Sequence, residues 1–301
     1  MSTSLPDPAA LQRSSHFCCR DHAVSLSQRQ AAGAPMKIAL ATILAAIVFL
    51  FSAADPIFAA GCAFEAQGEG RVVGIVDGRG FRLHDGREIR LEGIEAAAPE
   101  KFPRVLAAML DGRDVRLSGS DDTPDRYGRQ HAFVWLLPSE TLVQVELLTR
   151  GEAILTAAVT DKACAATLLA AETEAREAKR GIWADPGAIK NTESPGDILA
   201  GMGRLTLVEG KVLSVRQAGA VTYLNFGRNW TRDFAVTIPR RALANLEAGG
   251  LVPKALENKR VRVRGIVEAR LGPRIEVLRA GQIELVEGNE SVSHSKAPAN
   301  R

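Results

Sequence analysis

Aromatic residues and arginines alternate in one short stretch in the second half of this 301-residue chain. Bases of single-stranded nucleic acid stack on exposed aromatic rings, and arginines bind the phosphates between them. Trp230 lies in a loop-like sequence between Arg228 and Arg232, so these three residues are candidates for substrate binding. Alternatively, Tyr223 and Phe234 are core residues of neighbouring strands. The stretch contains Tyr223, Phe226, Trp230, Phe234, Arg228, Arg232, Arg240 and Arg241.

The charge of the chain is unevenly distributed, although its net charge is only +3. Residues 61–187 hold 16 Lys and Arg against 21 Asp and Glu, whereas residues 204–287 hold 15 against 8. In addition, the alternation Arg260-x-Arg262-x-Arg264 predicts three cations on one face of a strand. A basic surface of this kind is typical of proteins that bind phosphate backbones. The alternative is a basic surface without a partner.

The first half contains a segment with charged residues at its turns. Residues 72–76 alternate apolar and polar side chains, Asp77-Gly78 and Asp85-Gly86 predict turns, and Ile89-Arg90-Leu91 leads into an acidic segment. This pattern predicts a β-meander. Without further information, Arg90 is interpreted as a strand residue paired with Glu92 or Glu95. His84 and His131 are isolated in the sequence and receive no metal or catalytic role.

The elements around this meander predict a partly open barrel of the oligonucleotide/oligosaccharide-binding (OB) type. The order is a five-stranded meander with one helix inserted after the third strand and further helices towards the end. The expected helices are residues 105–110, 143–150 and 161–180, and the expected later strands are residues 114–117, 130–137 and 153–156.

Three motifs in this region occur in the order found in the staphylococcal nuclease (thermonuclease) family. They are the loop Asp125-Arg126-Tyr127-Gly128-Arg129, the helix end Leu147-Leu148-x-x-Gly151 and the closing Gly181-Ile182-Trp183. The span from about Gly70 to Trp183 therefore resembles this family. The resemblance implies a nuclease that hydrolyses phosphodiesters of nucleic acid with oxygen-bound Ca²⁺, a glutamate acting on water, and two arginines on the phosphate.

The resemblance also implies roles for particular residues. Arg90 and Arg129 stand at the two arginine positions, and Tyr127 is a candidate for substrate binding. Asp77 and Glu95 are the candidate metal ligands, and Glu100 is the candidate base. Alternatively, Arg129 only neutralises the acidic residues of its own loop.

Two departures from the family pattern weaken the expected calcium site. Arg79 stands where the family has an aspartate ligand, and Ala96-Ala97-Ala98 displace Glu100 by two residues. A positive charge about 4 Å from a divalent ion opposes binding by several kcal/mol at an effective dielectric constant near 20. We therefore expect Ca²⁺ to bind weakly and no small-molecule cofactor. The alternative function is a catalytically inactive protein of the cell envelope that binds nucleic acid or other anions.

Beyond the first domain, predicted to span residues 61–187, the sequence predicts a linker at 188–203 and a second domain at 204–287. In this second domain we expect strands at 205–215, 222–226 and 234–238, a helix at 240–247, and a hairpin of 260–268 with 274–278. This order predicts a second small OB-like barrel. Residues 288–301 are expected to be a disordered tail, and the sequence does not indicate an oligomeric state.

The N-terminal region indicates export. Residues 38–51 form a short apolar run after Lys37, which is typical of a signal peptide, with Met36 as the expected initiator and residues 1–60 dispensable. We expect a periplasmic or extracellular protein; the alternative is a membrane anchor formed by residues 38–60. Export agrees with a Cys62–Cys164 disulfide. The alternatives are two free thiols, or Cys62 as a lipid-bearing residue.

Overall fold

The computed structural model describes residues 61–76 and 80–286, all of which lie in one compact unit of the chain. The expected signal peptide, Met36, Asp77, Arg79 and the tail at 288–301 lie outside the described residues. No helix in the described part of the chain is long and apolar enough to cross a membrane.

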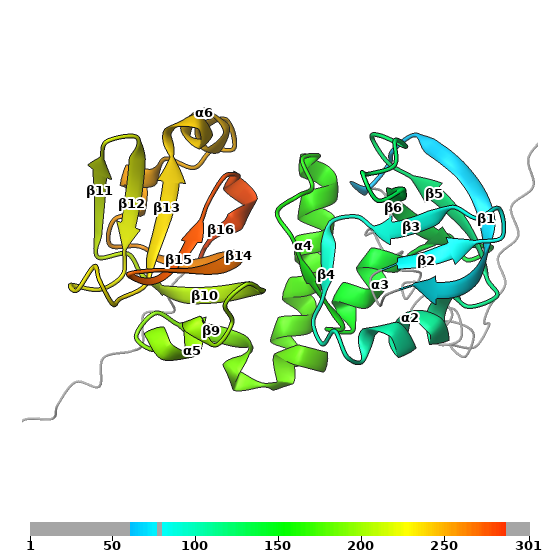
Figure 1. The fold of residues 1–301 in the computed structure, drawn as a ribbon, viewed down its shortest axis with the longest axis horizontal. Coiled ribbons are helices and arrows are strands. Elements are labelled where there is room, and N and C mark those ends of the chain that lie inside the picture. The colour runs from blue at the N-terminus through cyan, green and yellow to red at the C-terminus, as the bar shows by residue number, and fades with distance from the viewer. Residues whose placement is uncertain (1–60, 77–79, 287–301) are drawn as a thin grey trace, which may run out of the picture. The chain divides into compact units, whose positions relative to one another are not determined.

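The first sheet curls into a partly closed ring (Figure 1). Its strand order is β3-β2-β1-β5-β6-β7, and a further parallel pairing joins β3, at one end of the path, to β6, the strand next to the other end. The predicted fold class, a β-barrel with helices, is therefore confirmed. The strands are β1 (Ala66–Val76), β2 (Gly80–Leu83), β3 (Glu88–Leu91), β5 (Asp114–Ser118), β6 (Arg129–Leu136) and β7 (Thr141–Leu142).

The long strand β1 makes this ring possible because it serves two neighbours. Its N-terminal half pairs with β5 and its C-terminal half pairs with β2, and each pairing contains an irregularity in register. Irregularities of this kind bend a strand and increase its twist, which allows a sheet to curl. Apolar side chains of alternating positions, such as Val72, Phe81 and Leu117, fill the interior and are at most 1% exposed.

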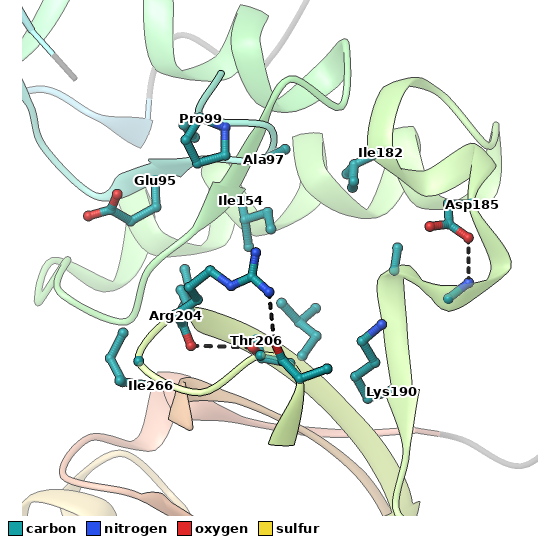
Figure 2. A pocket seen from close by; sticks show the side chains of 18 residues that line it. Glu95, Ala97, Pro99, Ile154, Ile182, Asp185, Lys190, Arg204, Thr206 and Ile266 are labelled. Atoms are coloured by element: carbon teal, nitrogen blue, oxygen red, sulfur yellow. Dashed lines mark hydrogen bonds between the residues drawn. The ribbon is translucent and has the colours of Figure 1, made fainter. Parts of the chain in front are cut away.

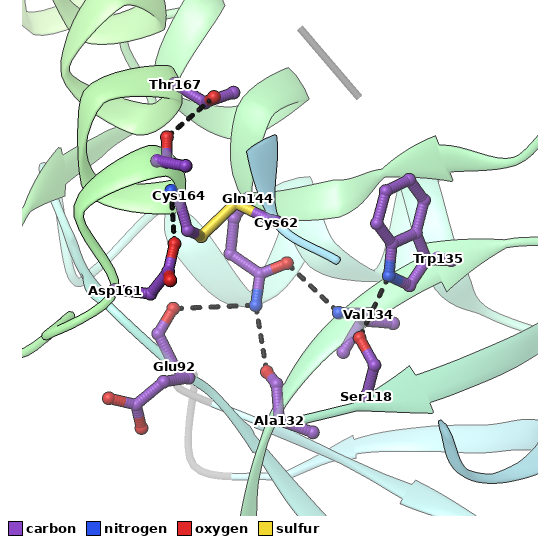
Figure 3. The surroundings of a disulfide bond; sticks show 11 residues. Cys62, Glu92, Ser118, Ala132, Val134, Trp135, Gln144, Asp161, Cys164 and Thr167 are labelled. Atoms are coloured by element: carbon purple, nitrogen blue, oxygen red, sulfur yellow. Dashed lines mark hydrogen bonds between the residues drawn. A yellow bond between two sulfur atoms is a disulfide. The ribbon is translucent and has the colours of Figure 1, made fainter. Parts of the chain in front are cut away.

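Helices and a small sheet cover the ring. The helices are α2 (Phe102–Leu110), α3 (Val143–Thr149) and α4 (Lys162–Glu177), and β4 (Ile94–Ala96) pairs with β8 (Ala153–Leu155). Gln144 of α3 is fully buried, and its amide donates to the Ala132 carbonyl at 2.9 Å and accepts from the Val134 amide at 3.2 Å (Figure 3). Because these partners belong to β6, the side chain fixes α3 against the sheet.

The disulfide between Cys62 and Cys164 is present, as predicted (Figure 3). Both cysteines are fully buried, and the bond ties the first described residues to the start of α4. The Asp161 carboxylate accepts a hydrogen bond from the Cys164 backbone amide at 2.8 Å and caps this helix. The N-terminus of the domain and its longest helix are therefore held together covalently.

Residues 188–203, where the sequence predicts a linker, contain regular secondary structure. They contain β9 (Ile189–Asn191), which pairs in parallel with β10 (Leu205–Lys211), and α5 (Pro195–Leu199). Ile198 of α5 is fully buried in the core of the second sheet. The sequence Ser194-Pro195-Gly196 is typical of a loop, but proline is also favoured in the first turn of a helix, and α5 begins at Pro195.

The second sheet has the order β11-β12-β13-β15-β14-β10-β9, with β16 paired to β14. The stretch 205–215, expected to be one strand, is interrupted at the buried Val212 and divides into β10 and β11. The OB-like character of this part of the chain and the exact domain limits stay predictions. Its remaining elements are β11 (Ser214–Ala218), β12 (Val221–Asn225), β13 (Ala235–Pro239), α6 (Arg240–Ala248), β14 (Arg260–Arg270), β15 (Gly272–Glu276) and β16 (Ile283–Leu285).

A buried ion-pair network joins the second sheet to α4 of the first barrel. Arg264 of β14 is 1% exposed and donates to Glu172 of α4 at 2.7 Å, to Glu284 of β16, and to the carbonyl oxygen of Leu155 at 2.8 Å. Burial alone would lower the pKa of Arg264, but the carboxylates of Glu172 and Glu284 raise it above its ordinary value. The guanidinium therefore stays charged inside the protein.

The charges on the expected basic face of β14 are largely compensated. Arg262 donates to Glu209 at 2.8 Å and to Glu284 at 3.2 Å, and Arg260 donates to Glu209 at 2.8 Å. All three arginines of this face, Arg260, Arg262 and Arg264, therefore pair with carboxylates. Their alternation does place them on one face, but that face meets carboxylates distant in the sequence.

Candidate functional site

The pairing of β3 with β6 brings Arg90 and Arg129 together. In the parallel register, Arg90 lies opposite His131 and Glu88 lies opposite Arg129. Residues opposite each other in a ladder share a face of the sheet, as do residues two apart along a strand. All four side chains therefore project from one face, and both arginines line the same small cavity of about 10 Å³. Two arginines far apart in the sequence thus lie on the same face of the sheet, each paired with a carboxylate.

Arg90 is held by Glu95, the candidate metal ligand. The Arg90 Nη2 donates to the Glu95 Oε1 at 2.9 Å, and the two side chains are only 19% and 27% exposed. The residue-based interpretation of Arg90 as a strand arginine paired with this carboxylate is confirmed. A substrate phosphate that binds Arg90 must therefore compete with Glu95.

Arg129 is held in the same way by Asp125. Its Nε and Nη2 donate to the Asp125 Oδ2 at 3.0 and 2.7 Å, and the backbone amides of Tyr127 and Arg129 donate to the other oxygen. These hydrogen bonds, first of all that from the Arg129 side chain, hold the pKa of Asp125 far below its ordinary value. The loop is closed by Gly128, whose φ of 78° is in the left-handed region. The loop therefore fixes the direction of Arg129.

Tyr127 stands beside this arginine on the surface. Its side chain is an exposed aromatic, and the guanidinium carbons of Arg126 and Arg129 lie 4.7 and 4.9 Å from its ring centroid. Such a cation–π stack orients the guanidinium groups and leaves an aromatic surface next to them. The arrangement suits a nucleotide whose phosphate meets Arg129 and whose base or sugar contacts Tyr127.

His131 belongs to the site, although we assigned it no role from the sequence. Its Nδ1 lies 3.0 Å from the Glu92 Oε2 and its Nε2 lies 3.6 Å from the Asp125 Oδ2. The residue is not isolated, because two carboxylates from other segments surround its ring. The signal that could have found it is its position two residues after Arg129 on the same strand.

The candidate acids are not all brought to the arginines. Glu100 lies in an exposed turn that precedes α2, and Asp77 lies outside the described residues. The described part of the chain contains no group of three or more His, Cys, Asp or Glu residues that could hold a metal ion. Since Ca²⁺ takes six to eight oxygen ligands, the described donors do not by themselves make a calcium site. A weak Ca²⁺ site at Asp77 and Glu95 stays a prediction.

The aromatic residues of the second sheet separate into core and surface. Phe226 and Phe234 are buried and pack against each other with ring centroids 5.1 Å apart, and Tyr223 is half-buried. Trp230 is 69% exposed in the loop between β12 and β13. Arg228 is also exposed, and the Arg232 side chain is 77% exposed. Trp230, Arg228 and Arg232 thus share one exposed loop, remote in the sequence from Arg90.

Comparison with known families identifies the first barrel. The family described as staphylococcal nuclease homologue matches residues 97–185, a span that begins after Glu95 and includes Arg129, α3 and α4. No curated protein matches the chain significantly. The matched span and the ring of strands indicate the same kind of domain, and Arg90 and Arg129 lie on one face of this ring. The first barrel of this chain is a staphylococcal nuclease-like domain.

Proposed function

We propose that this protein is a nuclease-like hydrolase that binds the phosphodiester backbone of nucleic acid at Arg90 and Arg129. The observation that supports it is the common face on β3 and β6 from which both guanidinium groups project. Arginine binds phosphate oxygens through a planar fork of donors, so two arginines side by side can hold several oxygens of one phosphate. They would also stabilise the charge that develops during hydrolysis.

The ion pairs of the site suggest how binding prepares the reaction. When a phosphate takes the donors of Arg90, it displaces the hydrogen bond of 2.9 Å between Arg90 and Glu95, and the Glu95 carboxylate then lies beside the bound phosphate. An attacking water must give up a proton as its oxygen bonds to phosphorus and the leaving oxygen departs. From the family resemblance, Glu100 is our candidate for the base that accepts this proton. Glu95, in contrast, is the carboxylate in contact with Arg90.

A second candidate function is binding without hydrolysis. It is favoured by the arginine at position 79 and by the carboxylates that already neutralise Arg90 and Arg129. A site that keeps its phosphate-binding arginines but loses an acidic ligand can still recognise nucleic acid. In this case the protein would be a binder of nucleic acid or other anions in the cell envelope.

The second sheet would contribute a stacking site. Trp230 presents an exposed indole, and Arg228 and Arg232 lie two residues to either side of it. Stacking on an aromatic ring tolerates any base, so this loop suits single-stranded DNA or RNA without sequence preference. We infer that it supports substrate binding and takes no part in the chemistry.

The disulfide supports our proposal that the protein is exported. A fully buried Cys62–Cys164 bond requires an oxidising compartment to form and persist, such as the periplasm or the cell exterior. The expected signal peptide at residues 38–51 would deliver the chain there. Fractionation of cells, with mass analysis of the N-terminus, tests export and separates a cleaved signal from an anchor.

One experiment decides between hydrolysis and binding. The full chain, purified with its disulfide intact, is incubated with end-labelled single-stranded DNA or RNA, with Ca²⁺ and with a chelator. Arg90→Ala and Arg129→Ala are compared with Arg150→Ala, a control that also pairs with a carboxylate but ends α3. Cleavage lost only in the first two variants supports the hydrolase. Binding without cleavage by the wild type, with cleavage appearing in Arg79→Asp, supports the binder.

A further inference from the structure

A cleft of about 350 Å³ lies between β4 of the first barrel and β10 of the second sheet (Figure 2). Glu95, Pro99 and Ile154 line it from the first barrel, and Lys190 and Arg204 line it from the second sheet. Its volume falls in the range of natural ligand pockets, which begins near 300 Å³. No role in the proposed function depends on this cleft.

The cleft is next to the arginine site, and one ion pair connects them. Glu95 pairs with Arg90 at 2.9 Å and also lines the cleft. The edge of the cleft therefore lies one side chain away from Arg90, so the next phosphates of a strand bound at Arg90 would be close to the cleft.

The charges of the cleft favour an anion. Among the lining residues, Glu95 is paired with Arg90, and Asp185 stays a charged carboxylate although it accepts a hydrogen bond from the Gly187 amide at 2.8 Å. Lys190 and Arg204, in contrast, make no ion pair with the residues that the structure describes. The Arg204 Nη2 donates to the carbonyl oxygen of Ala200 at 2.7 Å, which fixes its direction without neutralising it.

The walls of the cleft also suit a nucleotide. Ile154 and Ile266 offer apolar surface for a base or sugar. Next to Ile154, the hydrogen bond from Arg264 to the carbonyl oxygen of Leu155 connects the two walls of the cleft.

We propose that this cleft binds the sugar–phosphate backbone of a single nucleic-acid strand next to the phosphate held by Arg90, with Lys190 and Arg204 as its phosphate contacts. The inference deepens the proposed function and rests on it. It assigns the second sheet a direct part in substrate binding, separate from the Trp230 loop. Because the cleft lies beyond the Arg90 site, it is reached only by a strand longer than the group at that site.

The test compares a labelled dinucleotide with a longer single-stranded oligonucleotide, by fluorescence anisotropy on the full chain at several salt concentrations. The variant is Lys190→Ala/Arg204→Ala, and the control is Lys211→Ala, an exposed lysine at the end of β10. We expect the double variant to bind the longer strand at least about tenfold more weakly, with a salt slope reduced by about 1.4. Its dinucleotide affinity should equal that of the wild type.

The outcomes separate this inference from the proposed function. If the double variant binds the longer oligonucleotide with the same affinity as the Lys211→Ala control, the cleft is not a binding site. Undiminished dinucleotide binding by Arg90→Ala instead overturns the arginine site, whatever the cleft variant does. Arg204→Glu provides a second variant, which should lower the affinity for the longer oligonucleotide further. Thermal unfolding shows whether each variant is folded.

Discussion

The substitution Arg264→Met tests the connection between the two halves of the described structure. Arg264 is 1% exposed, its partner Glu172 is fully buried, and the two belong to β14 and α4. Methionine fills a similar volume but removes the charge. The carboxylate of Glu172 then stays buried with one of its two arginine partners missing.

The structure sets the size of the expected effect. Removing one partner of a buried ion pair typically costs 3–5 kcal/mol of stability. Glu172 keeps Arg176 at 3.0 Å and the Leu155 amide at 2.8 Å, so its charge remains partly compensated. We therefore expect Arg264→Met to lower the free energy of unfolding by about 3 kcal/mol, the lower end of this range. Adding Glu172→Gln should restore much of this loss, because the amide leaves no unpaired charge.

Denaturant unfolding of the full chain under non-reducing conditions measures these differences. The control is Arg260→Met, which removes an arginine that pairs with Glu209 but is 53% exposed. An exposed pair contributes at most about 1 kcal/mol. If Arg264→Met and Arg260→Met destabilise the protein equally, or if Glu172→Gln makes Arg264→Met still less stable, the network does not join the halves as described.

Three further predictions concern other parts of the structure. Cys62→Ser/Cys164→Ser should lower the free energy of unfolding by about 2–5 kcal/mol, since the bond closes a separation of 102 residues; equal stability of reduced and oxidised wild type would contradict this. Burial raises the pKa of Glu284, but Arg264 and Arg176 lower it below its ordinary value of 4.5. The contribution of Glu284 to stability is therefore complete above pH 4.5 and is lost as the pH falls through its pKa in the folded state. On acidification, Glu284→Gln should therefore lose less stability than the wild type does. Trp230→Ala should weaken binding of single strands by about 1–3 kcal/mol. In the same variant the unfolding midpoint should stay unchanged, and a large drop would mean that the indole is structural.

The local pattern of the sequence predicted most of the first barrel. The alternation in 72–76, the turn at Asp85-Gly86 and the alanine-rich run after Asp161 each describe contacts within a few residues. These contacts decide where strands and helices begin and end. The predicted helices at 105–110 and 161–180 correspond to α2 and α4 with small shifts at their ends.

What the sequence did not predict depends on contacts between distant residues. Arg264 appeared to be a surface cation because Glu172, its partner, lies 92 residues away. His131 appeared isolated because Glu92 approaches it only when β3 and β6 pair. The segment 188–203 appeared irregular because its helix gains stability mainly by burying Ile198 in a distant core. In each case the decisive interaction is created by folding.

The salt dependence of oligonucleotide binding tests the central claim most directly. Each phosphate contact to a single strand contributes about 0.7 to the slope of the logarithm of affinity against the logarithm of salt concentration. We predict that Arg90→Ala/Arg129→Ala lowers this slope by about 1.4, while Arg150→Ala leaves it unchanged. A double variant with the slope and affinity of the wild type would show that these two arginines do not bind the phosphates of nucleic acid.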